Sequence, residues 1–143
     1  MGKIKAILKV KGHKVYSVEP TIMVYQAIEL MCEKNIGGLL IEENGNLVGI
    51  FTERDYARKL ILKGKSSKDT PISELMTRDV IRVTPDNTVE ECLHLMSGKR
   101  IRHLPVMEDN KLVGMISIGD LVKYIIEEQK SIIEHLEHYI TNH

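Results

Sequence analysis

The chain has 143 residues, of which 43% are hydrophobic and 28% are charged. This is the length of one domain, or of two small lobes that share a core. Twenty basic side chains balance twenty acidic ones, so no overall field favours nucleic acid or a membrane surface, and we expect neither as a partner. No segment approaches the roughly 18 apolar residues of a spanning helix, and the start lacks the apolar segment of a signal peptide. We therefore expect a cytoplasmic protein.

The sequence is an internal duplication. When it is shifted on itself by 65 residues, 15 of the 47 pairs between residues 15–61 and 80–126 are identical, without a gap. A repeat of this length is usually a unit that cannot bury its own apolar face, so two copies pack together. We therefore expect pseudo-twofold symmetry, with any cleft occurring twice.

In the first copy, residues 15–18 alternate as a short strand that stops at Pro20. Two apolar runs at 39–41 and 47–51 then flank an Asn-Gly turn, which is a strong hairpin signal. A second helix is predicted from about 54 to 62. The first helix is indicated by apolar residues at positions i, i+3, i+4 and i+7: Val24, Ala27, Ile28 and Met31.

The second copy repeats this order after a polar linker, 63–71, and a short amphipathic turn, 72–76. Its predicted strands are 80–83, 104–106 and 112–116. Its first helix has the same apolar stripe, and a second helix begins at about Gly119. Thr88 with Glu91 fits a capping box before the first helix. The predicted fold class is therefore mixed α+β, with two βαββα repeats.

The two cysteines, Cys32 and Cys92, fall inside the predicted helices. They have neither the CxxC spacing of a metal or redox site nor the density of a disulfide scaffold. We predict that both are buried core thiols, and we predict no metal site.

The last predicted helix continues well beyond its counterpart in the first copy. Its apolar stripe contains Ile125, Ile132, Ile133, Leu136 and Ile140. Something must cover this stripe, either the body of the same chain or a second copy. We favour a homodimer contact.

Both copies contain a Gly-x-x-[Ser/Thr]-x-x-Asp segment, at 49–55 and 114–120, where the hairpin ends and a helix begins. With the upstream Val-x-x-x-Pro pattern and the Arg-His-Leu-Pro-Val run at 102–106, the chain resembles a pair of cystathionine β-synthase (CBS) domains. The boundaries we expect are 7–66 and 67–126, followed by a helical extension, 127–143.

The motif also has a physical interpretation. Thr52 and Ser117 could cap the following helix or bind a phosphate at its amino end. Asp55 and Asp120 lie in the first turn, where the helix dipole favours a carboxylate even without a ligand. A carboxylate can also accept hydrogen bonds from the two hydroxyls of a ribose. Because both copies carry the same acid at the same spacing, we favour the ribose role.

The resemblance implies how two clefts would be built across the pair. Each aspartate would hold a ribose, and each hydroxyl would approach a phosphate. The first cleft would combine one motif with the other copy's pocket: Ser117 and Asp120 with Tyr16, Ser17, Ile36 and Gly37. The second would combine Thr52 and Asp55 with Ile81, Arg82, Ile101 and Arg102.

The two clefts should differ in charge. The second copy has Lys99, Arg100, Arg102 and His103 where the first has Lys34, Asn35, Gly37 and Gly38. Arginine matches phosphate oxygens well, and Arg54 and Arg58 could add charge. The Gly37-Gly38 pair departs from the basic pair of the family. This departure casts doubt on a phosphate contact from that strand and could leave room for a larger ligand.

We find no nucleophile elbow, zinc motif or Walker loop, so we expect no enzyme and no cofactor. We expect a regulatory module that binds an adenine nucleotide, with AMP as the first choice and ADP, ATP, NAD or an S-adenosyl compound as alternatives. The effector would be a separate protein. The alternative from another class is an interaction scaffold whose clefts stay empty.

Overall fold

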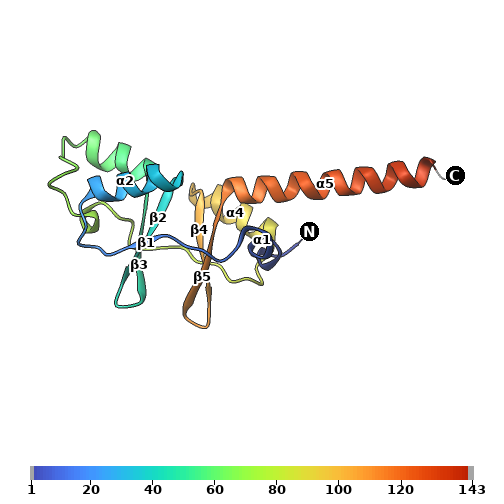
Figure 1. The fold of residues 1–143 in the computed structure, drawn as a ribbon, viewed down its shortest axis with the longest axis horizontal. Coiled ribbons are helices and arrows are strands. Elements are labelled where there is room, and N and C mark those ends of the chain that lie inside the picture. Colours follow the sequence, from blue (N-terminus) through green and yellow to red (C-terminus); the bar gives the residue numbers. More distant parts are fainter. Residues whose placement is uncertain (1, 142–143) are drawn as a thin grey trace.

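The structure, a computed structural model, describes residues 2–141. It contains two hairpins that lie side by side, with helices along one edge of each (Figure 1). The first unit contains β1 (Ser17–Val18), α2 (Val24–Lys34), β2 (Gly38–Glu43), β3 (Asn46–Thr52) and α3 (Glu53–Asp55), which continues as a π-helix, Tyr56–Ile61. The second contains α4 (Val89–Lys99), β4 (His103–Glu108), β5 (Lys111–Ser117) and α5 (Ile118–Thr141). The predicted mixed α+β class is confirmed.

Both predicted hairpins form in matching register. Leu40 pairs with Ile50 between β2 and β3, and Leu104 pairs with Ile116 between β4 and β5. Each hairpin has a register shift at an equivalent place, after Ile41 and after Val106. Both turns use residues with positive φ, as tight hairpin turns require.

The first strand of each unit is shorter than predicted. β1 has two residues and pairs parallel to β2. The prediction of a strand over 80–83 is wrong: Val83 makes one isolated parallel bridge to Val106, and no strand forms there. Val80 and Ile81 instead line a cavity, and Arg82 donates to the Leu47 carbonyl of the other unit at 3.2 Å. The segment therefore pairs with β4 at Val83 alone, and the residues before it face the first unit.

Two segments outside the repeats are exchanged between the units. Helix α1 (Ile4–Lys11), which the sequence analysis did not predict, inserts Ile4, Ile7 and Leu8 into the core of the second unit. The segment 72–76, which begins as a 3-10 turn at Ile72–Glu74, packs into the core of the first unit. Each core is therefore completed by residues that precede the other repeat.

This exchange explains a glycine that both copies share. A Cβ atom on Gly49 would lie 2.5 Å from Met76 Sδ, and one on Gly114 would lie 2.6 Å from Leu8 Cδ2. A larger residue would fit only if the Met76 or Leu8 side chain shifted, so the exchanged segments favour glycine at the centres of β3 and β5.

The two cysteines differ in burial. Cys92 is buried, as predicted, and burial, with a contribution from Glu91, raises the pKa of its thiol to about 11. The prediction for Cys32 is wrong, because its side chain is exposed. Cys32 lies one position after Met31, the last residue of the buried stripe of α2, so it faces solvent.

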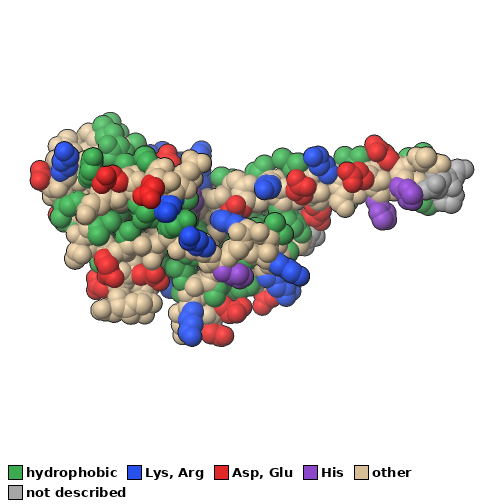
Figure 2. Space-filling model, viewed as in Figure 1, with side chains coloured by type: hydrophobic (Ala, Val, Ile, Leu, Met, Phe, Trp, Pro, Cys, Tyr) green, Lys and Arg blue, Asp and Glu red, His purple; other side chains and the backbone are tan. Residues whose placement is uncertain are grey.

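Helix α5 extends beyond the body of the molecule as a rod (Figure 1). Its apolar side chains beyond Ile126 are largely exposed, and Figure 2 shows them along the rod: Ile132 is 49% exposed and Leu136 is 57% exposed. Of the predicted stripe, Ile125 packs against the core of the second unit, whereas the later residues are exposed. Residues 142 and 143 of the expected extension lie outside the described residues.

None of the described helices meets the length and apolarity that crossing a membrane would need.

Candidate functional site

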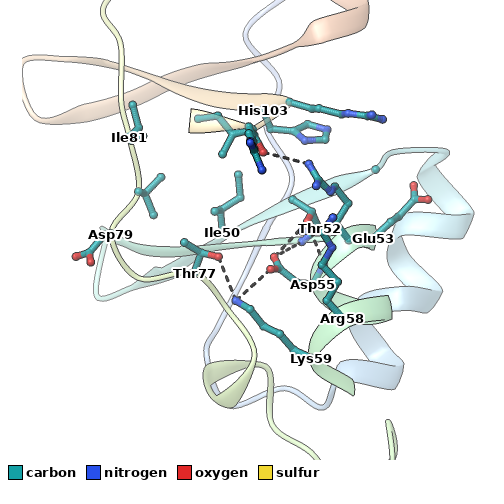
Figure 3. A pocket seen from close by; sticks show the side chains of 16 residues that line it. Ile50, Thr52, Glu53, Asp55, Arg58, Lys59, Thr77, Asp79, Ile81 and His103 are labelled. Atoms are coloured by element: carbon teal, nitrogen blue, oxygen red, sulfur yellow. Dashed lines mark hydrogen bonds and ion pairs between the residues drawn. The ribbon is translucent and has the colours of Figure 1, made fainter. Parts of the chain in front are cut away.

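A cavity of about 450 Å³ lies between the two units. Its walls come from the end of β3 and the following helix, from the linker into the second unit, and from the start of β4 (Figure 3). The lining residues that sequence analysis named are Gly37, Thr52, Arg54, Asp55, Arg58, Arg100, Ile81, Ile101, Arg102 and His103. The volume lies in the usual range of small-molecule sites, about 300–1,000 Å³.

The Thr52 and Asp55 side chains form a capping box at one corner of the cavity. Asp55 N donates to Thr52 Oγ1 at 3.3 Å, and Thr52 N donates to Asp55 Oδ2 at 2.9 Å. Asp55 Oδ1 pairs with Lys59 Nζ at 3.1 Å. Lys59 in turn donates to Thr77 Oγ1 at 3.3 Å, as the dashed lines of Figure 3 show. The capping role that we left open is therefore observed at Thr52.

The walls above this corner combine apolar and basic groups. Ile50, Ile81 and Ile101 supply an apolar surface from three different segments. The lining includes five basic side chains and three acidic ones, so its net charge is positive: Arg54, Arg58, Lys59, Arg100 and Arg102, against Glu53, Asp55 and Asp79. Arg54 Nη1 donates to the Arg100 carbonyl at 3.1 Å, which joins the units at the cavity rim. Such a site suits a ligand with a flat apolar part and an anionic part.

His103 projects from the second unit onto the backbone of the first. A Cβ atom on Gly38 would lie 3.3 Å from the His103 ring, and one on Gly37 would lie 3.7 Å from it. We expected the space beside the Gly37-Gly38 pair to leave room for a larger ligand. The imidazole of His103 occupies this space instead. Burial, reinforced by Lys11 and Arg102, lowers the pKa of His103 despite the opposing effects of Asp120 and Glu53.

The second motif has the same capping geometry with a different cation. Ser117 N donates to Asp120 Oδ2 at 2.8 Å, and Asp120 N donates to Ser117 Oγ at 3.2 Å. Lys11 Nζ, from α1, reaches Asp120 Oδ2 at 2.6 Å and the Met115 carbonyl at 2.7 Å. Burial would raise the pKa of Asp120, but the Lys11 and Ser117 hydrogen bonds outweigh it and hold the pKa below its usual value.

Of the residues predicted for the first cleft, Gly37 lines this cavity, and the first cleft itself stays a prediction. Tyr16, Ser17, Ile36, Ser117 and Asp120 are absent from the lining of the cavity, as is Arg82. Ser17 Oγ donates to Glu42 Oε2 at 2.7 Å. The ammonium groups of Lys14 and Lys34 lie 5.3 and 5.7 Å from the centre of the Tyr16 ring.

Sequence reasoning missed several lining residues, among them Ile50, Glu53, Lys59, Thr77 and Asp79. Lys59 lies one helical turn after Asp55, and this spacing could have indicated it. Thr77 and Asp79 lie in the linker, where no periodic pattern gives a signal. Thr77 is placed by backbone hydrogen bonds with Ile50 of 2.8 and 3.0 Å.

No metal centre accompanies this site. Within residues 2–141, no three His, Cys, Asp or Glu side chains are grouped in a way that could hold a metal ion.

Two copied units of mixed helix and strand with a cavity between them define a class of protein, the tandem-repeat α+β module. Comparison with known sequences identifies the family: the CBS domain profile matches residues 9–62 and again 72–127. The chain therefore belongs to the CBS domain family, as a tandem pair.

Several relatives support this assignment. A protein with CBS domains from Burkholderia ambifaria is 47% identical, with a TM-score of 0.87 over 90% of this chain and 96% of that one. The mitochondrial CBS domain-containing protein CBSX3 of Arabidopsis thaliana is 42% identical over 122 residues. This match covers 82% of the present chain but 59% of CBSX3.

A third relative carries ligands. The CBS domain pair of the protein MJ0100 was solved with 5′-methylthioadenosine and S-adenosyl-L-methionine. It is 29% identical, with a TM-score of 0.78, and the match covers 90% of this chain and 98% of that one.

Proposed function

We propose that this chain is a regulatory module that binds an adenine nucleotide, with AMP as the first choice, in the cavity beside Asp55, and that it catalyses no reaction. The observation that carries the proposal is the composition of one cavity. A carboxylate, an isoleucine wall and a basic rim face the same space and match the sugar, base and phosphate of a nucleotide. Each group comes from a different segment of the chain.

The ribose would be held by Asp55, whose side chain is 13% exposed. Binding would require its Oδ1 atom to exchange the Lys59 ammonium for a sugar hydroxyl, and Lys59 could then turn toward the phosphate. The base would lie between Ile81 and Ile101, and the phosphate would face Arg54 and Arg102. The regulatory step is a population shift, because a ligand that contacts both units favours the arrangement in which they are closed.

Calorimetric titration with AMP tests the proposal. We expect Asp55→Asn to weaken binding about ten- to a hundredfold, since a charge-assisted hydrogen bond contributes roughly 1.5–3 kcal/mol. Asp120→Asn is the matched control, because it changes the equivalent acid outside the cavity and should bind AMP as the unmodified chain does. Equal affinity of the unmodified chain and Asp55→Asn would contradict the assignment.

The ligand class has a second candidate. MJ0100, a relative, holds adenosine compounds that carry sulfur and lack a phosphate. A thermal-shift panel of AMP, ADP, ATP, NAD and S-adenosylmethionine separates the candidates, because a ligand that binds the native state raises the melting temperature. If S-adenosylmethionine alone raises the melting temperature, the ligand is an S-adenosyl compound and not a nucleotide. If no compound raises it, the scaffold alternative is favoured.

The proposal includes two protein partners. One is an effector, a separate protein that senses the ligand-dependent arrangement. The other is a second copy of this chain, which would bind the exposed apolar face of α5.

A further inference from the structure

A groove on the outer side of the cavity shares its arginine rim. Arg54, Arg100 and Arg102 line both the cavity and this groove. The floor of the groove is apolar and comes from the helices of the second unit, including Leu93 of α4 and Ile118 of α5. It is therefore a basic and apolar surface next to the point where α5 begins.

The exposed end of α5 has the complementary composition. Residues 131–141 contain two glutamates and neither lysine nor arginine. At 100° per residue, Ile132, Leu136 and Ile140 fall on one face. Glu137 lies at the flank of that face, and Glu134 lies on the opposite side of the helix.

We propose that α5 pairs antiparallel with α5 of a second copy, so that the acidic end of each helix lies against the basic groove of the other copy. Charge selects this direction. In a parallel pair the acidic ends would lie together, whereas in an antiparallel pair Glu137 approaches the arginine rim. The proposal does not depend on which ligand fills the cavity.

The spacing of the apolar residues supplies a register. Five apolar residues and one polar residue follow alternating steps of four and three, the spacing of a helix pair: Ile118, Val122, Ile125, Gln129, Ile132 and Leu136. Ile118 and Ile125 also pack on one side against the core of their own second unit. An antiparallel pair that sets Ile118 opposite Leu136 also sets Val122 opposite Ile132. These last two side chains are 45% and 49% exposed in the single chain, so both are available for a partner.

Cysteine cross-linking tests the direction. The variants Val122→Cys and Ile132→Cys would be made in a Cys32→Ser background, since Cys32 is exposed and Cys92 is buried. We expect a disulfide-linked dimer when the two variants are mixed, and none from either alone. A dimer from either single variant would indicate a parallel pair and overturn the proposal, as would the absence of a cross-link in the mixture.

Sedimentation tests the charge contact. We expect Glu137→Arg to raise the dimer dissociation constant about tenfold or more, because it places like charges together at both symmetric contacts. Arg100→Glu should have a similar effect, and the two changes combined should restore dimerisation. Glu134→Arg is the matched control on the opposite helix face and should leave the dimer intact.

A monomeric chain at tens of micromolar, or a dimer that Glu137→Arg leaves unchanged, would overturn the proposal. Circular dichroism of each variant establishes that the helices remain folded. Weakening of the dimer by salt is a further expected result, because the attraction between exposed charges is screened.

Discussion

The two copied aspartates carry out the same local task with different cations. Both complete a capping box, which accounts for the acid at each position without a ligand. Asp55 pairs with Lys59 of its own helix, whereas Asp120 pairs with Lys11 from α1. Tyr124 occupies the position equivalent to Lys59. The ribose role of either aspartate stays a prediction, and the cavity favours Asp55 for it.

The Lys11 contact predicts a pH-dependent contribution to stability. Lys11 lowers the pKa of Asp120 in the folded state below the value near 3.8 that Asp120 has in the unfolded chain. The ion pair therefore stabilises the fold at pH values above 3.8. This contribution is lost as the pH falls through the lower pKa of the folded state. We expect Lys11→Met to cost about 0.5–1 kcal/mol at pH 7, since both side chains are partly exposed. Urea denaturation at pH 7 and pH 3 measures this cost, with the exposed Lys9→Met as control. A cost that persists unchanged at pH 3 would contradict the ion pair.

His103 gives a second prediction at this scale. Burial and the Lys11 charge both lower its pKa, so it should titrate below the ordinary value of 6.5. Lys11→Met removes one cause and should raise the pKa, with burial still holding it below 6.5. Histidine NMR titration measures both values. A pKa at or above 6.5 in the unmodified chain would show that the ring does not pack onto the Gly37-Gly38 backbone.

Helices and hairpins could be predicted well from the sequence, because each has a local signal. The stripe beginning at Val24, the capping box at Thr88 and the Asn-Gly turn depend on residues close in the chain, and the structure places all three as predicted. The strand over 80–83 was predicted wrongly: Val83 alone pairs with β4, and nothing in the local pattern indicates that Val80 and Ile81 line a cavity. Helix α1 was missed because it is short, and its apolar residues match no pattern in the other copy.

Helix α1 predicts a measurable effect on the second unit. Leu8 is fully buried there, so Leu8→Ala should lower the free energy of unfolding by about 2–5 kcal/mol. Val10 lies on the same helix and is 87% exposed. Val10→Ala should therefore change the free energy of unfolding by less than about 0.5 kcal/mol. Urea denaturation compares the two. Equal effects would mean that α1 does not complete this core.

The exchanged segments determine how the whole molecule behaves. Each unit has its own core, yet each core needs residues that precede the other repeat. The units should therefore unfold together. Calorimetry should give one transition whose van't Hoff and calorimetric enthalpies agree. Two separate transitions would show that the exchange does not couple the units.

The sequence by itself determined the duplication, the helix-hairpin-helix order of each copy, the membership that the two motifs indicated, and ten of the sixteen residues that line the cavity. These features depend on spacings of a few residues or on the similarity between the two copies. Both can be recognised in the linear sequence. Tertiary structure decided which copy α1 completes, which aspartate faces a cavity, and where His103 lies. These features depend on contacts between residues as far apart as Lys11 and Asp120, and no periodic pattern encodes such distances. Two copied units thus acquire different surroundings at their equivalent aspartates, because the segments outside the repeat are not copies of each other.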